Sequence, residues 1–119
     1  MSSLPHQRIR FAHDSERDLA AVLDFYRLEW RYEPTTFVLR TDDEGQPVEG
    51  FTPDFYLPRF DLYLEVTTLR QRLVTKKNRK VRLLHEQYPH VRCKLLYRRD
   101  VVALAAQFDL TDTQARLAS

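Results

Sequence analysis

Apolar residues recur at helical spacing over residues 13–30 and predict the first helix of the chain. Ser15 is placed to cap its start, and Asp18 stands in the capping-box position three residues later. The side chains expected on the buried side of this helix are Leu19, Val22, Leu23, Tyr26 and Trp30.

A strand pattern follows the first helix. Residues 31–40 are rich in β-forming side chains and predict a strand, whereas residues 41–50 hold both glycines and predict a loop or a loose hairpin tip. Residues 51–67 predict two further strands joined by a tight turn. The second of these puts two sets of side chains on opposite faces, namely Phe60, Leu62, Leu64 and Val66 against Asp61, Tyr63, Glu65 and Thr67.

The second half predicts a helix, a strand and a short helix. Thr68 and Gln71 form a capping box for a helix that runs to about Tyr88, before Pro89. Residues 91–99 alternate as a fourth strand, and a last helix is expected from an Asp100 cap to about residue 110. Because a β-α-β connection crosses over right-handed, the last two strands should be parallel.

This element order, α-β-β-β-α-β with a C-terminal helix, predicts an α/β fold with a mixed four-stranded sheet flanked by helices. The 119 residues favour a single domain over 1–119, with an ordered core at about 14–110 and a flexible tail. Hydrophobic residues make up 43% of the chain, which is enough for a packed core.

The composition also indicates a compartment. No apolar run approaches the ~20 residues of a membrane span, so we expect no membrane partner. The first ten residues lack the apolar stretch of a signal peptide, which favours the cytoplasm. The single cysteine, Cys93, fits a reducing compartment and an ordinary place in the core.

Charge is divided unevenly along the chain. Residues 1–65 hold thirteen acidic and seven basic side chains, a net charge of −6, whereas residues 66–100 hold eleven basic and two acidic side chains, a net charge of +9. A block this basic is typical of a phosphate binder and predicts a nucleic-acid partner, although a solvated helix face is the plainer alternative. The candidate phosphate contacts are Arg70, Arg72, Lys76, Lys80, Arg98 and Arg99.

Two carboxylates interrupt the strand pattern. If the turn is centred between Arg59 and Phe60, Asp54 lies opposite Glu65 on the same face, with Cβ atoms about 5 Å apart. Such like charges repel, and a shared Mg²⁺ ion would offset the repulsion. Glu16 borders the apolar side of the first helix and could join this site, or it could be a first-turn acid favoured by the helix dipole.

Lys77 interrupts the apolar stripe of the basic helix, whose other members are Leu73, Val81, Leu84 and Tyr88. A lysine in this position either extends to water or meets an anion. In the second case it would reach Asp54 and Glu65, or a phosphate bound beside them.

These residues resemble the motif of the PD-(D/E)xK nuclease superfamily, the restriction-endonuclease-like and resolvase-like proteins. The PD half matches at Pro53 and Asp54, and the second half matches at Glu65 to Thr67, with Thr67 in place of the usual lysine. The element order resembles the family core as well, over about residues 15–110.

The resemblance implies a metal-dependent endonuclease that hydrolyses phosphodiester bonds, with DNA as the expected substrate and without sequence specificity or directed by DNA structure. It implies Mg²⁺ as cofactor, replaceable by Mn²⁺, and no small-molecule cofactor. Cutting both strands together would need a homodimer. The alternatives are a catalytically impaired nucleic-acid-binding domain and a protein-interaction domain on the same fold. The residue roles implied are metal ligation by Asp54, Glu65, the Val66 carbonyl and Glu16, catalysis by Lys77, and assistance by Thr67 and Gln71.

Overall fold

The computed structural model describes residues 4–67 and 71–107 of the chain. Its main sheet has four strands in the order β1 (Arg31–Tyr32), β4 (Phe55–Leu57), β5 (Leu62–Thr67) and β6 (Cys93–Tyr97). β4 pairs antiparallel with both β1 and β5, whereas β5 and β6 are parallel. The α/β class, the mixed four-stranded sheet and the parallel last pair are therefore confirmed.

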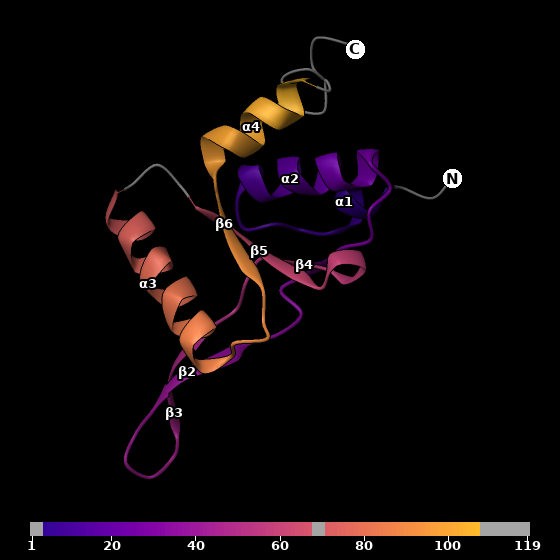
Figure 1. Ribbon diagram of the computed structural model, residues 1–119. Coiled ribbons are helices and arrows are strands. Elements are labelled where there is room, and N and C mark those ends of the chain that lie inside the picture. The colour runs from indigo at the N-terminus through magenta and orange to yellow at the C-terminus, as the bar shows by residue number, and fades with distance from the viewer. Residues whose placement is uncertain (1–3, 68–70, 108–119) are drawn as a thin grey trace.

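Helices cover both faces of this sheet (Figure 1). On one face lie α2 (Asp14–Phe25) and α4 (Arg98–Gln107), and on the other lies α3 (Gln71–Gln87). A short helix that the sequence did not indicate, α1 (Pro5–Arg8), precedes α2. Because both faces are covered, the central strand β5 is enclosed along its last four residues.

The first core lies between the sheet and the pair α2 and α4. Its centre is Phe55, whose ring is fully buried and packs 5.5 Å from Trp30 and 5.9 Å from Phe11, centroid to centroid. The buried residues around it are Leu19, Leu23, Leu57, Leu64, Val66 and Val101. This core fixes α2, and with it Glu16, against the end of β4.

The second core lies under α3. Leu84 from α3 is fully buried there with Cys93 of β6, as the apolar stripe and the alternating strand predicted. Tyr63 packs against this cluster while its neighbours Leu62 and Leu64 face the first core. The predicted alternation is confirmed along β5, and Glu65 lies on the α3 face. It is wrong for Phe60 and Asp61, which lie outside β5, and Phe60 is 44% exposed.

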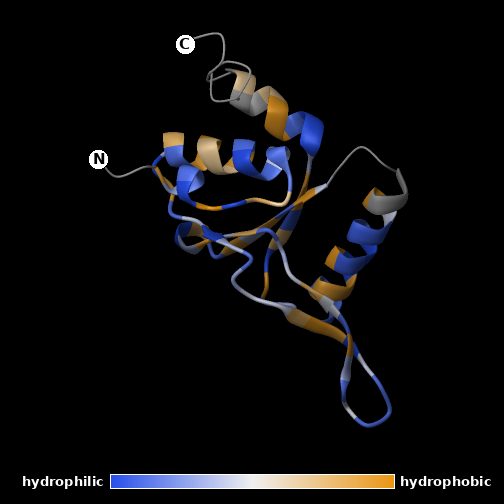
Figure 2. Cartoon of the chain, turned by 180° about the vertical axis from the view of Figure 1, so that it is seen from behind, coloured by the Kyte–Doolittle hydropathy of each residue, from blue (hydrophilic) through white to orange (hydrophobic). Residues whose placement is uncertain are grey.

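A two-stranded arm projects beyond the main sheet (Figures 1 and 2). It consists of β2 (Phe37–Thr41) and β3 (Pro47–Phe51), so residues 31–40 are not one strand but parts of two sheets. The extended conformation is interrupted at Glu33, which has a left-handed φ of 47°, and at Pro34, which lacks the backbone N–H needed for strand pairing. The segment 41–50, predicted as a loop or a loose hairpin tip, is the tip of a hairpin and also supplies most of β3.

Helix α3 and Tyr88, the residue directly after it, hold the arm to the main part of the molecule. The Tyr88 hydroxyl donates to the Val38 carbonyl at 2.9 Å, and Arg79 pairs with Glu49 at 2.7 Å. At the tip, the Asp42 carboxylate accepts the N–H groups of Glu44 and Gln46 at 2.9 and 2.8 Å. The arm is thus an ordered extension with an acidic tip, which appears blue in Figure 2.

Two predicted helix caps are wrong. Helix α2 begins at Asp14, so Ser15 lies inside the first turn and is buried, and no side chain caps this end. Helix α4 begins at Arg98, two residues before Asp100, because β6 already ends at Tyr97. The predicted capping box of Thr68 and Gln71 is not covered by the structure, because residue 68 and the side chain of Gln71 lie outside the described part of the chain.

The end of the first helix also differs from the prediction. Helix α2 ends at Phe25, where Arg27 takes a left-handed φ of 55° and turns the chain. Tyr26 is therefore 52% exposed instead of buried. Trp30 is buried as predicted, but it enters the core from the segment that leads into β1.

The hairpin of β4 and β5 has the predicted register. Phe55 pairs with Leu64, and Leu57 pairs with Leu62. Continued by one residue, this register places Asp54 opposite Glu65. The turn between them is a 3-10 helix, Pro58–Phe60, closed by Asp61 in the left-handed region with a φ of 48°.

Among the described helices, none is both long and apolar enough to cross a bilayer.

We expect Phe55→Ala to lower the free energy of unfolding by about 4 kcal/mol, because it removes a fully buried ring from the first core. Urea denaturation followed by circular dichroism measures the change. The control Phe60→Ala removes a ring that is 44% exposed and should cost less than about 1 kcal/mol. Equal losses for the two variants would contradict this account of the core.

Candidate metal-binding site

Asp54 and Glu65 meet across neighbouring strands. The Asp54 N–H donates to Glu65 Oε1 at 3.0 Å, and the Val66 N–H donates to Asp54 Oδ2 at 2.8 Å. Both residues are buried, with 8% and 6% of their surface exposed. The expected convergence of the two acids is therefore present, and each carboxylate accepts a backbone N–H from the other strand segment.

Burial shapes the charge of this pair. It raises the pKa of Asp54 to about 7, helped by repulsion from Glu65 and opposed by the Val66 N–H and by Lys77. Burial raises the pKa of Glu65 as well, and the nearby Lys77 ammonium opposes that rise. Asp54 is thus an acid that holds its proton more tightly than an ordinary aspartate.

Lys77 reaches this pair from α3. Its ammonium lies 3.2 Å from Glu65 Oε2 and also donates to the Val66 carbonyl oxygen. Its side chain is only 27% exposed. Of the two alternatives for this lysine, the structure shows the one in which it meets an anion.

Glu16 comes to the site from the other side of the sheet. Carboxylate oxygens of Glu16, Glu33 and Asp54 all lie within 4.8 Å of one another. Glu16 is 3% exposed and accepts a hydrogen bond from the Tyr32 hydroxyl. Burial raises the pKa of Glu16, and the hydrogen bond from Tyr32 opposes the rise. The first-helix acid therefore faces Asp54, as expected of a site residue.

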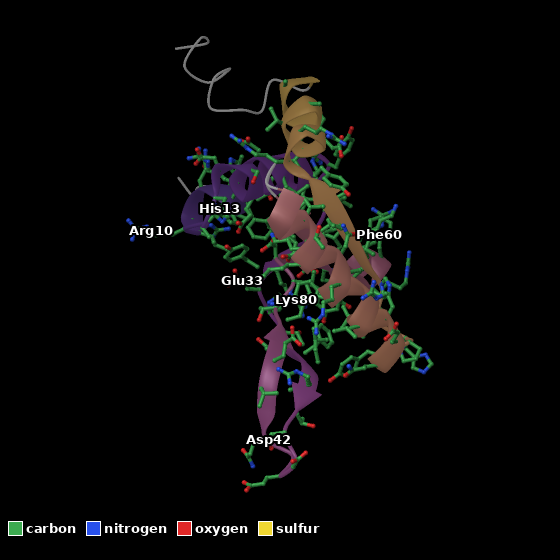
Figure 3. The ribbon with its side chains drawn as sticks, turned by 90° about the vertical axis from the view of Figure 1, so that its left-hand side faces the viewer. Arg10, His13, Glu33, Asp42, Phe60 and Lys80 are labelled. Atoms are coloured by element: carbon green, nitrogen blue, oxygen red, sulfur yellow. The ribbon has the colours of Figure 1, made fainter. Side chains whose placement is uncertain are left out.

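Glu33 is the site residue that the sequence reasoning missed. It follows β1, and its backbone N–H donates to the Asp54 carbonyl at 2.8 Å. Its side chain is exposed, and Figure 3 shows it between the N-terminal helices and the arm. The sequence offered one indication, an acidic residue directly before Pro34. Because residues 31–40 were predicted as one continuous strand, the end of that strand at Glu33 was not recognised.

The donor set suits a hard divalent cation. Three carboxylates within reach of one another are the oxygen ligands that Mg²⁺ and Mn²⁺ prefer. Glu33 is exposed, so the group opens to solvent on one side. Glu65 and the Val66 carbonyl differ from these three, because Lys77 already contacts both.

Thr67, the residue two positions after Glu65, is fully buried on the Glu65 face of β5. Its hydroxyl oxygen has no hydrogen-bond partner in the part of the chain that the structure describes. Gln71, the other predicted helper, lies in the first turn of α3, and its side chain is outside the described part.

The candidate phosphate contacts that the structure describes come from α3 and from the start of α4. Lys76 is exposed on α3, and Lys80 bonds the Gly50 carbonyl at 3.4 Å, near the middle of the molecule in Figure 3. Arg98 lines a cavity of about 230 Å³ at the start of α2, and Arg99 lies over the Tyr97 ring at 5.2 Å. Arg70 and the side chain of Arg72 lie outside the described residues.

Comparison of the chain with known protein families, curated proteins and solved structures found no match. The chemistry of the site is therefore argued from the residues of this chain.

Asp54→Asn tests the electrostatics of the buried pair. Since the native state raises the pKa of Asp54 from 3.8 to about 7, the stability that its proton contributes is present at low pH and lost as pH rises toward 7. Asparagine does not ionise, so the stability of the variant relative to the wild type should rise by about 4 kcal/mol between pH 4 and pH 8. Urea denaturation in chelator at each pH measures this. A gain toward low pH would contradict the assignment.

Tyr32→Phe tests how Glu16 is held. The variant removes the hydroxyl that donates to the Glu16 carboxylate, so we expect about tenfold weaker Mn²⁺ binding by calorimetry. Tyr56→Phe is the matched control, because its hydroxyl bonds Asp61 at the hairpin turn instead. Equal affinities for the two variants would show that the hydroxyl of Tyr32 does not position Glu16.

Proposed function

We propose that the chain is a metal-dependent nuclease that hydrolyses phosphodiester bonds of DNA, on a restriction-endonuclease-like core. One observation carries this proposal: oxygens of Glu16, Glu33 and Asp54 lie within 4.8 Å of one another. They do so where the PD and ExT segments meet, next to the ion pair of Glu65 with a lysine from a basic helix. Metal-assisted phosphodiester hydrolysis uses carboxylates that bind a divalent ion and a positively charged side chain beside it.

A divalent ion held by the three carboxylates would lower the pKa of a bound water and polarise the scissile phosphate. Asp54 and Glu16 are positioned for this by hydrogen bonds from Val66 and Tyr32. Lys77 places a positive charge close enough to oppose the rise in the pKa of Asp54. In a mostly buried place that charge is screened less than at the surface, so it favours negative charge that develops on the phosphate.

The basic side chains around the site would hold flanking phosphates. Lys76 and Lys80 extend from the same helix as Lys77, and Arg98 and Arg99 begin α4 beside the start of α2. Contacts of this kind give affinity without reading bases, so cleavage would be non-specific or directed by DNA structure.

The arm is an unfavourable place for such a substrate at its tip. Its acidic tip at Asp42 lies at the far end of the molecule in Figure 3, and would repel a polyanion. A homodimer would bring two sites to the two strands of a duplex. We place the activity in the cytoplasm, where a single cysteine stays reduced.

Cleavage assays on branched, single-stranded and linear DNA test the proposal, with Mg²⁺, with Mn²⁺ and with chelator. We expect metal-dependent cleavage that Glu33→Gln lowers at least tenfold at limiting Mg²⁺, because it removes one of the three carboxylates. Glu29→Gln is the matched control at an exposed glutamate and should cleave as the wild type does.

The other outcomes separate the alternatives. Salt-sensitive binding without cleavage under either metal would replace the enzyme by a nucleic-acid-binding domain. Absence of any binding would favour a protein-interaction domain on the same fold.

A further inference from the structure

Lys77 contacts two oxygens that a divalent ion at this place would need. Its Nζ lies 3.2 Å from Glu65 Oε2 and also donates to the backbone carbonyl of Val66. The two oxygens come from neighbouring residues of β5, and the side chain of Glu65 is only 7% exposed. The ammonium group therefore fills the space between a carboxylate and a carbonyl.

This arrangement excludes a second cation from the same space. Mg²⁺ binds its oxygens at about 2.0–2.1 Å, so an ion shared by Glu65 and the Val66 carbonyl would collide with the ammonium and repel its charge. Displacing Lys77 would cost free energy, because Glu65 would then be a buried carboxylate without its cationic partner.

The carboxylates of Glu16, Glu33 and Asp54 stand apart from this pair. Their mutual distances, within 4.8 Å, are met without Glu65. Glu16 and Glu33 come from α2 and from the residue after β1, whereas Lys77 comes from α3. The two groups adjoin through Asp54, whose N–H donates to Glu65.

We infer that Lys77 is a resident cation that takes the place of a second metal ion. The site accordingly holds one divalent ion, on Glu16, Glu33 and Asp54, and Glu65 serves as the anchor of Lys77 and not as a metal ligand. This inference rests on the metal site of the proposed function and assigns its ion count and the role of Lys77.

Calorimetric titration with Mn²⁺ at pH 8 tests the ion count. The wild type should bind one ion per chain. Lys77→Met should bind two, because it frees Glu65 and the Val66 carbonyl while keeping an unbranched side chain of similar length. Lys77→Arg keeps the charge, and Lys76→Met removes a neighbouring exposed charge instead, so both controls should bind one ion. The double variant Lys77→Met with Glu65→Gln should return to one.

The inference is overturned if Lys77→Met binds the same number of ions as the wild type, or if the wild type binds none. Should Lys77→Met fail to fold, Glu65→Gln decides the matter. That variant should bind one Mn²⁺ ion with an affinity within threefold of the wild type. A loss of affinity of tenfold or more would show that Glu65 is a metal ligand and would overturn the inference. DNA cleavage is measured separately, and its absence with one ion bound bears on the proposed function alone.

Discussion

The exchange of hydrogen bonds between Asp54 and β5 is the interaction on which the rest of the site depends. Asp54 gives its N–H to Glu65 and receives the N–H of Val66, so two acids of like charge are held next to each other in a buried place. Such a pair is costly unless cations or protons offset it. The Lys77 ammonium offsets part of it at Glu65. At Asp54, burial first and then repulsion by Glu65 raise the pKa to about 7, so a proton there also reduces the charge of the pair.

The two cores make this arrangement possible. Phe55 and its neighbours fasten α2 to one face of the sheet, which brings Glu16 to Asp54. Leu84 and Cys93 fasten α3 to the other face, which brings Lys77 to Glu65. The proximity of those carboxylates also affects Cys93, because burial first, and then repulsion by Glu65 and Asp54, raise the pKa of its thiol to about 12. Cys93 is therefore a packing residue, as its place in the strand pattern predicted.

The β-hairpin was predictable in detail because its two strands alternate cleanly and short turns restrict the register. The same reasoning failed at residues 31–40, where the left-handed residue Glu33 divides one apparent strand between two sheets. A positive φ at a glutamate has no strong signal in a single sequence, so Glu33 was not recognised beside Asp54. Lys77 was recognised as a candidate because a lysine in an apolar stripe either extends to water or meets an anion, and the structure shows the second. Its arrival from α3 also suits a buried Thr67, since a lysine there would bring a second ammonium to the same face of β5.

The carboxylates of the site come from separate parts of the chain. Glu16 lies on α2, Glu33 at the break after β1, and Asp54 before β4, with Lys77 on the opposite face of the sheet. No local segment can bring these groups together before both helices have docked. Capture of a divalent ion by the three carboxylates would therefore report that α2 has docked onto the sheet, and a nascent chain in which α2 is not docked would bind no ion at this place.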